Sequence, residues 1–205
     1  MNIPSKLISN AVEALSSLPG VGEKTALRLC LHLLKRPEEE VKDFCKSIFK
    51  MKTETCFCKK CHNISEQEIC NICNNPLRQQ HLICIVEDIK DVMAIENTME
   101  FNGTYHVLGG IISPIDGIGP GDINIASLFK RINNEDIREL IFALNPSIEG
   151  DTTTYYISRQ IKDKPIKVSS LARGIAFGGE LEYTDEFTLA KSILNRQPYE
   201  NFLVK

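Results

Sequence analysis

The chain has 205 residues, of which 42% are hydrophobic and 25% are charged, and its formal net charge is −3. These values are ordinary for a globular protein, and the length suits one large core or two or three small modules. No run of about eighteen apolar residues occurs, which excludes a membrane-spanning helix, and the N-terminal stretch lacks the continuous apolar core of a signal peptide. We therefore expect a cytoplasmic protein.

The distribution of charge along the chain is uneven. Residues 1–60 hold eleven Lys or Arg and seven Asp or Glu, a balance of +4, whereas residues 61–205 hold thirteen and twenty, a balance of −7. A basic segment joined to an acidic one favours polyanion binding at the basic end. Chance scatter of surface charge is the alternative interpretation, so charge by itself does not decide between the two.

Two helices joined by a glycine turn are predicted at the N-terminus. Apolar residues recur at helical spacing over residues 5–17 and again up to about residue 35, and the segment LPGVG at 18–22 interrupts them. Gly20 and Gly22 carry no Cβ, so the backbone at the turn can approach another backbone closely. The sequence therefore predicts a compact helical hairpin.

The start of the second helix is a candidate phosphate site. Its free N–H groups and the positive end of its dipole suit an anion. Lys24 and Arg28 lie four residues apart on one helix face and can reach successive phosphates without reading base sequence. The alternative is an ordinary glycine-containing connection with solvated Lys and Arg side chains. Because LPGVGEKTALRL resembles the helix-hairpin-helix motif of DNA-repair proteins, we expect DNA binding through Gly20, Gly22, Lys24 and Arg28.

Apolar patterns elsewhere predict buried positions. Pro37 opens a third predicted helix, and three isolated cysteines sit in apolar patterns typical of core residues. In the third helix the predicted buried stripe consists of Val41, Phe44, Ile48 and Phe49. The cysteines expected in the core are Cys30, Cys45 and Cys84.

A cluster of cysteines follows between residues 56 and 73. It contains two C-x2-C pairs, CKKC at 58–61 and CNIC at 70–73, which are separated by eight residues. Four thiolates at this spacing complete a tetrahedral zinc site and leave no open position for water, as is typical of a structural metal. The segment is too poor in apolar residues to build its own core, so metal binding would supply its folding energy. The predicted ligands of one Zn²⁺ per chain are Cys58, Cys61, Cys70 and Cys73.

Two further donors, Cys56 and His62, lie beside this cluster. We prefer Cys58 to Cys56 as a ligand, because Cys58 and Cys61 have the C-x2-C spacing. A redox dithiol is the competing interpretation of one C-x2-C pair, but two such pairs this close together favour a metal.

From residue 81 onward, predicted strands alternate with predicted helices. This alternation predicts a parallel sheet that is covered on both faces. The segment NPSIEGDTT at 145–153 is predicted to be a loop. The predicted strands are 82–87, 104–109, 139–144 and 165–170, and the predicted helices are 88–100, 123–133, 153–161 and 185–195.

Five acidic residues lie where the predicted strands end. Glu87, Asp88 and Asp91 follow the first strand, and Glu149 and Asp151 follow the third. Ligand sites of parallel sheets lie at this edge, and carboxylates there could hold Mg²⁺. The plainer alternative is that Asp88 and Asp151 are helix N-caps and that the others are solvated charges. No nucleophile motif accompanies the acids, so a bound Mg²⁺ is the less favoured interpretation.

The order of these parts resembles the RecR family of bacterial recombination proteins over roughly residues 3–197. After the hairpin and the four-cysteine finger, IVEDIKDVMAIENT and YHVLGGIISPIDGIGPGDI are similar to that family's Toprim domain, and ALNPSIEGDTTTYYI and GGELEYTDEFTLAKSILNR complete the pattern. The resemblance implies a multi-module α+β protein with a mainly parallel sheet. The implied modules are a helix-hairpin-helix DNA-binding domain (1–53), a zinc finger (54–77), a Toprim domain (80–176) and a C-terminal assembly segment (177–205).

The resemblance also implies a function. Members of the family are expected to form a ring-like tetramer that encircles or clamps DNA at single-stranded gaps. They work with RecO, and in many bacteria with RecF, to help load the recombinase RecA. The resemblance places Lys24 and Arg28 against DNA and implies a non-enzymatic protein of the bacterial cytoplasm that associates with the nucleoid.

The acidic residues acquire roles from the same resemblance. Glu87, Asp88 and Asp91 lie where the family's Toprim acids meet RecO, and Glu149 and Asp151 occupy the place of the paired aspartates of catalytic Toprim enzymes.

Two positions depart from the family pattern. Ser170 stands where a basic residue is expected, and Ala176 stands where proline is usual. These departures put in doubt the details of C-terminal packing or assembly.

Two other functions stay open. A Mg²⁺-dependent nuclease, primase or topoisomerase of the Toprim class would need Glu149 and Asp151 to bind the ion, and a topoisomerase would also need a catalytic tyrosine. Tyr155 and Tyr156 sit in a helical pattern that favours packing or simple exposure. The second alternative is a zinc-dependent protein-interaction module that makes no functional DNA contact.

Overall fold

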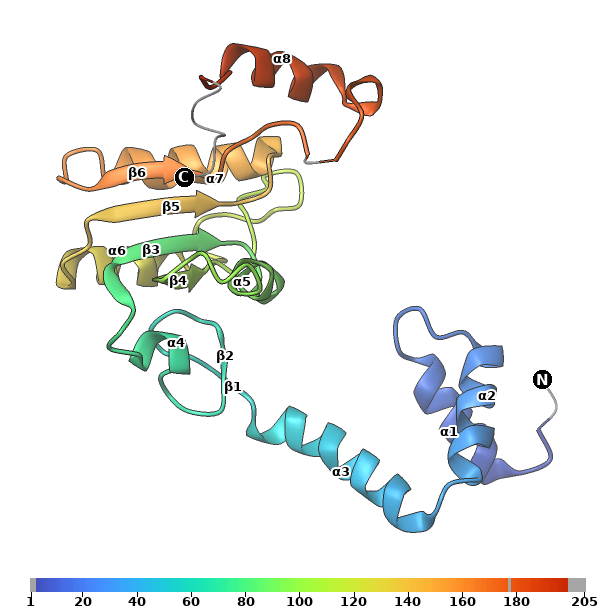
Figure 1. The fold of residues 1–205 in the computed structure, drawn as a ribbon. Coiled ribbons are helices and arrows are strands. Elements are labelled where there is room, and N and C mark those ends of the chain that lie inside the picture. Colours follow the sequence, from blue (N-terminus) through green and yellow to red (C-terminus); the bar gives the residue numbers. More distant parts are fainter. Residues whose placement is uncertain (1–2, 177, 199–205) are drawn as a thin grey trace. The chain divides into compact units, whose positions relative to one another are not determined.

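The computed structural model describes residues 3–176 and 178–198, and the chain divides into two compact units, Met1–Thr55 and Cys56–Lys205. The first unit is helical, as predicted (Figure 1). Its helices are α1 (Lys6–Ser16), α2 (Glu23–Leu34) and α3 (Glu38–Glu54).

A small apolar core holds α1 and α2 together. Val12 from α1 and Ala26 and Cys30 from α2 are buried against one another. The chain turns between the two helices through residues 17–22, where the N–H group of Val21 donates a hydrogen bond to the carbonyl oxygen of Leu18 at 3.1 Å. The predicted hairpin is therefore present, and the prediction that Cys30 is a core residue is confirmed.

The prediction of a buried stripe on α3 is wrong. The structure describes all seventeen residues of this helix, and none of them is buried. Phe49 is 68% exposed, and Cys45, which was expected in the core, is exposed as well. Apolar spacing shows that a helix has an apolar face, but it does not supply the element that would cover that face. The other members of the expected stripe, Phe44 and Ile48, are also exposed, and Val41 is half-buried.

The second unit begins with a short cysteine-rich segment, which we call the finger (residues 56–75), and continues into an α/β domain. The finger contains one two-stranded antiparallel ladder and a single turn of helix. Its elements are β1 (Cys56–Phe57), β2 (Ile64–Ser65) and α4 (Asn71–Asn74).

The α/β domain is built on a four-stranded sheet in the order β4-β3-β5-β6, and every pair of neighbouring strands is parallel. In the central register, Cys84 lies opposite Tyr105 on one side and Ile141 on the other. The predicted parallel sheet is confirmed, and Figure 1 shows its strands side by side. The strands are β3 (Gln79–Val86), β4 (Gly103–Val107), β5 (Glu139–Ala143) and β6 (Lys167–Ser170).

Side chains that alternate along β3 supply both faces of this sheet. Ile83 and Ile85 belong to a large apolar cluster with α6 and α7, whereas Cys84 and Val86 belong to a second cluster with α5. Apolar clusters form on both faces of the sheet because a parallel strand buries the side chains that point to either face. The prediction that Cys84 is a core residue is confirmed. The covering helices are α5 (Ile89–Glu96), α6 (Ile125–Asn134) and α7 (Ile148–Gln160).

Helix α7 begins earlier than the sequence predicts, because a serine caps it inside the expected loop at 145–153. Ser147 Oγ accepts a hydrogen bond from the N–H group of Gly150 at 3.1 Å, as an N-cap residue does. The loop then passes so close to the first turn that a Cβ on Gly150 would lie 2.1 Å from the carbonyl oxygen of Asn145.

The C-terminal segment carries a short 3-10 turn and one further helix, where a helix was predicted near 185–195. Asp185 caps this helix through a 2.8 Å hydrogen bond from the N–H group of Thr188. Residues 177 and 199–205 of the expected assembly segment lie outside the described residues. Among the residues that are described, no helix has the length and apolar character needed to cross a bilayer. The two elements are η1 (Leu181–Tyr183) and α8 (Glu186–Leu194).

Gly150→Ala is expected to lower the free energy of unfolding by about 1–3 kcal/mol, because the new methyl group forces the backbone at Asn145 to move. Urea denaturation of the two proteins measures the difference. Gly121→Ala is the matched control, since a Cβ at Gly121 meets no atom within 4 Å. Equal midpoints for the two alanine variants would contradict the expectation.

Candidate metal centre and nucleic-acid interface

The four predicted cysteines come together in the finger. The sulfur atoms of Cys58, Cys61, Cys70 and Cys73 all lie within 4.8 Å of one another, and all four side chains are buried. Cys61 Sγ and Cys70 Sγ are 3.5 Å apart. Four thiolates at about 2.3 Å from a zinc ion lie roughly 3.8 Å from one another, so the cluster has the size and the chemistry of a closed four-cysteine zinc site.

Hydrogen bonds among the sulfurs favour one thiolate in this cluster, at Cys70. Hydrogen bonding with Cys61 and Cys73 lowers the pKa of Cys70, and hydrogen bonding with Cys70 raises the pKa of Cys61. The pKa of Cys73 is raised as well, although its hydrogen bond with Cys61 acts the other way. The backbone N–H group of Cys70 also points at Cys58 Sγ at 3.3 Å. A thiolate is the form that binds metal, so the other thiols of the cluster have to release their protons when zinc binds.

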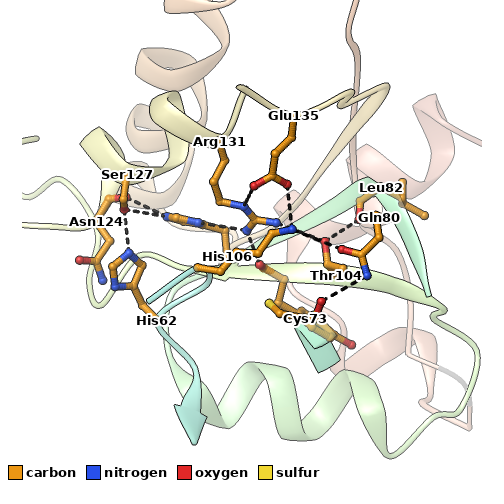
Figure 2. A network of polar contacts seen from close by, with 12 residues as sticks. His62, Cys73, Gln80, Leu82, Thr104, His106, Asn124, Ser127, Arg131 and Glu135 are labelled. Atoms are coloured by element: carbon orange, nitrogen blue, oxygen red, sulfur yellow. Dashed lines mark hydrogen bonds and ion pairs between the residues drawn. The ribbon is translucent and has the colours of Figure 1, made fainter. Parts of the chain in front are cut away.

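The two alternative donors lie outside this group of four. Cys56 is exposed, and its sulfur lies 3.3 Å from the carbonyl oxygen of Gln67. His62 has a left-handed backbone, with φ of 62°, and its Nε2 lies 2.7 Å from Ser127 Oγ on α6. Figure 2 shows the ring of His62 beside Ser127 and Asn124. The cluster of four sulfurs thus contains Cys58 and leaves Cys56 outside it.

The hairpin brings its four predicted residues to the start of α2. Gly20 has φ of +79°, a left-handed conformation that glycine adopts without strain, and Gly22 is the N-cap. Among the described residues no side chain caps this helix, so the N–H groups of its first turn have no side-chain acceptor there. Lys24 and Arg28 are exposed on the first two turns, and neither forms an ion pair with an acid in the described part of the chain.

The acids that follow β3 are engaged in local structure. Asp88 is the N-cap of α5, as one interpretation predicted, and it forms a capping box with Asp91. Asp91 Oδ2 accepts a hydrogen bond from the N–H group of Asp88 at 2.9 Å. Glu87 accepts a hydrogen bond from the side-chain amide of Asn145 at 3.1 Å. Two of the three carboxylates are thus committed to starting a helix.

The acids that follow β5 are arranged differently from the N-cap prediction. Asp151 is not a cap, because Ser147 holds that position, and its carboxylate forms a two-pronged ion pair with Arg173. The hydrogen bonds from Arg173 hold the pKa of Asp151 below its usual range. Sequence reasoning missed Arg173, which is 22 residues away, and no periodicity signals such a pair. Within the described residues, the cysteine cluster is the one group of potential ligands close enough to share a metal ion.

Comparisons with known proteins agree with this geometry. The recombination protein RecR of Flavobacterium psychrophilum is 53% identical to this chain and covers 98% of both sequences. RecR of Amoebophilus asiaticus is also 53% identical, over 97% of this chain and 100% of its own, and RecR of Bacteroides fragilis is 52% identical over 96% of each. The chain belongs to the RecR family.

Family models place the parts of RecR in the predicted order. The resemblance inferred from the sequence is confirmed, as are the fold class and the zinc finger. The boundaries predicted for the four modules stay a prediction. The matches are to the RecR helix-hairpin-helix (residues 8–51), the RecR four-cysteine zinc finger domain (55–75), the Toprim domain (81–172) and the RecR C-terminal region (174–197).

Cys61→Ala is expected to abolish stoichiometric zinc binding, because three sulfurs cannot close a tetrahedral site. Metal content after gel filtration, measured by elemental analysis, checks this. Cys56→Ala is the control and is expected to retain the metal, since its sulfur lies outside the cluster. Loss of zinc in the Cys56 variant, or full retention in the Cys61 variant, would overturn the ligand assignment.

Proposed function

We propose that this RecR-family protein is a DNA-binding scaffold of recombinational repair. It acts with RecO and RecF to help load RecA at single-stranded gaps, and it works as a homo-oligomer, a ring tetramer, in the bacterial cytoplasm at the nucleoid. The observation that carries the proposal is the uncapped start of α2 behind a glycine turn, with two exposed cations on its first turns.

The first turn of α2 suits a phosphate chemically. Its N–H groups have no side-chain acceptor, and the positive end of the helix dipole adds to the charges of Lys24 and Arg28. Contacts of this type neutralise phosphates and release counterions, so they grip DNA of any sequence. Gly20 and Gly22 allow the backbone of the turn to come close to the DNA strand.

The partner surfaces follow from charge and exposure. Glu87, Asp88 and Asp91 lie at the carboxyl end of β3 in the acidic second unit, where they offer a complementary surface to a basic partner such as RecO. Exposed apolar side chains, among them Phe49 on α3 and Phe187 on α8, support self-association.

The acids of the Toprim domain support a role without catalysis. Asp151 is neutralised by Arg173, and Asp88 and Asp91 serve the cap of α5. A Mg²⁺ site at Glu149 and Asp151 would have to displace a guanidinium group that already supplies the positive charge. We therefore propose that the chain positions DNA and partners and carries out no cleavage or relaxation.

The double variant Lys24→Ala/Arg28→Ala is expected to bind gapped DNA more weakly. The slope of log binding constant against log salt should flatten by about two units, because two phosphate contacts are lost. Fluorescence anisotropy on labelled gapped DNA across a salt series, with and without RecO, measures both quantities.

Lys46→Ala/Lys50→Ala is the matched control, since it removes two exposed charges at the same spacing from α3. Equal losses in the two double variants would mean that general basic charge, and not the hairpin, binds DNA. The absence of any DNA binding by the unaltered protein, even with RecO, would support a zinc-dependent interaction module instead.

With Mg²⁺ present, the purified protein is expected to leave plasmid and single-stranded DNA uncut and supercoils unrelaxed. Gel electrophoresis of the DNA after incubation tests this, with Glu149→Ala as the matched preparation. Cleavage or relaxation that needs Mg²⁺ and disappears in the Glu149 variant would establish the enzymatic alternative.

A further inference from the structure

The polar contacts between the finger and the α/β domain converge on a buried arginine. Arg131 on α6 is only 6% exposed, although its guanidinium group is permanently charged. Its Nη1 donates a hydrogen bond to the carbonyl oxygen of Tyr105 at 2.7 Å, and its Nη2 lies 3.4 Å from Thr104 Oγ1. A buried charge is tolerated where its donors are satisfied, so these β4 groups and the arginine hold one another in place (Figure 2).

A histidine of β4 extends this arrangement. His106 Nε2 lies 2.8 Å from the carbonyl oxygen of Asn124, which can only accept, so Nε2 carries the proton. The other ring nitrogen then accepts a hydrogen bond from Arg131 Nη1 at 3.4 Å. Burial lowers the pKa of His106 to about 3, and the neighbouring Arg131 charge acts in the same direction. The ring is therefore neutral and serves as a fixed link between β4 and α6.

The finger contacts this network through Lys60, the residue before Cys61. Lys60 Nζ lies 3.1 Å from Glu135 Oε2, and the other oxygen of Glu135 accepts a hydrogen bond from Arg131 Nε at 3.4 Å. Lys60 also donates to Gln80 at the start of β3. The carboxylate of Glu135 thus joins a cation of the finger to the buried cation of α6.

The finger makes a second contact with the network through His62, the residue after Cys61. His62 Nε2 donates to Ser127 Oγ at 2.7 Å, and Ser127 donates in turn to the carbonyl oxygen of Asn124 at 2.8 Å, which is the same oxygen that His106 contacts. Cys61, which lies between Lys60 and His62 in the chain, makes a third contact. Its carbonyl oxygen accepts a hydrogen bond from the backbone N–H of Val107, the last residue of β4, at 2.8 Å.

We propose that this network couples zinc binding by the finger to the order of β4 and α6, with Arg131 as the positioning residue. The zinc ligands fix the turn at 58–61, and that turn places the two side chains and the carbonyl group on which the network depends. Coupling between two equilibria is reciprocal. A weakened network therefore lowers the affinity of the finger for zinc, which is measured as faster release when the rate of zinc binding is unchanged. Removal of zinc in turn loosens β4 before the far side of the sheet.

Zinc release to a colorimetric chelator tests the first direction. Arg131→Met is expected to release zinc at least about fivefold faster than the unaltered protein, the lower end of ordinary coupling between sites. Ser127→Ala removes the hydroxyl group that links His62 to the carbonyl oxygen of Asn124, leaves the buried arginine in place, and is expected to accelerate release in the same direction. It keeps the test decisive if the arginine variant does not fold.

Arg138→Met is the matched control, because Arg138 is exposed and pairs with its neighbour Asp136. Release from this variant is expected to match that of the unaltered protein. If Ser127→Ala and every folded Arg131 variant release zinc at the control rate, the coupling does not exist.

Amide hydrogen exchange tests the reverse direction. After chelation of zinc from the unaltered chain, the amides of Thr104–Val107 in β4 are expected to lose protection, while those of β5 and β6 keep theirs. Unchanged protection in β4 would overturn the proposal. A uniform loss over all four strands would overturn it as well, because zinc would then stabilise the whole unit without a route through β4.

Discussion

A parallel sheet has to be covered on both faces, and in this chain one of the two covers includes the metal-binding module. The residues of β3 alternate between the faces, so that Ile85 packs with α6 and α7 while Val86 packs with α5. Ile72 from α4 of the finger packs on the same face as α5. The finger is too small to form a core of its own, and it packs instead against the core of the Toprim sheet. The two modules are therefore parts of one compact unit, in agreement with the division of the chain at residue 55.

This arrangement also explains why the acids of the Toprim domain behave as structural groups. Parallel strands bring their carboxyl ends to one edge, so the segments that carry Glu87, Asp88 and Glu149 all begin at the same edge of the sheet. Carboxylates gathered in this way repel one another unless each finds a partner. Helix N–H groups satisfy Asp88, and a guanidinium group satisfies Asp151. Protein groups therefore offset the charges of two of these acids, Asp88 and Asp151.

The sequence predicts the parts of this molecule whose physical cause is local. The C-x2-C spacing identifies all four zinc ligands, and runs of apolar residues locate the strands, because both signals lie within a few residues. The glycine turn and the start of α2 are local as well. The start of α7 at Ile148 was missed, because the capping serine sits inside a segment rich in loop-forming residues.

Features that depend on distant partners could not be predicted. Apolar spacing on α3 indicates an amphipathic helix, but whether Phe44 is buried depends on what lies against it. In the same way, Arg131 looks like a surface cation on an amphipathic helix, and its burial is set by acceptors about 25 residues away on β4. His62 resembles a metal ligand in sequence, and its true partner, Ser127, is 65 residues distant.

The buried arginine has an evolutionary consequence. A substitution at position 131 removes the donor that Arg131 supplies to His106 Nδ1 and to the carbonyl oxygen of Tyr105, and a substitution at Glu135 removes the carboxylate that pairs with both Lys60 and Arg131. Single changes at any of these positions are therefore harmful, while concerted changes can be neutral. Positions 60, 106, 131 and 135 should covary among relatives as one set. The same selection would make the finger and the Toprim domain evolve together. The two would then be inherited as a pair and not exchanged between proteins as separate modules.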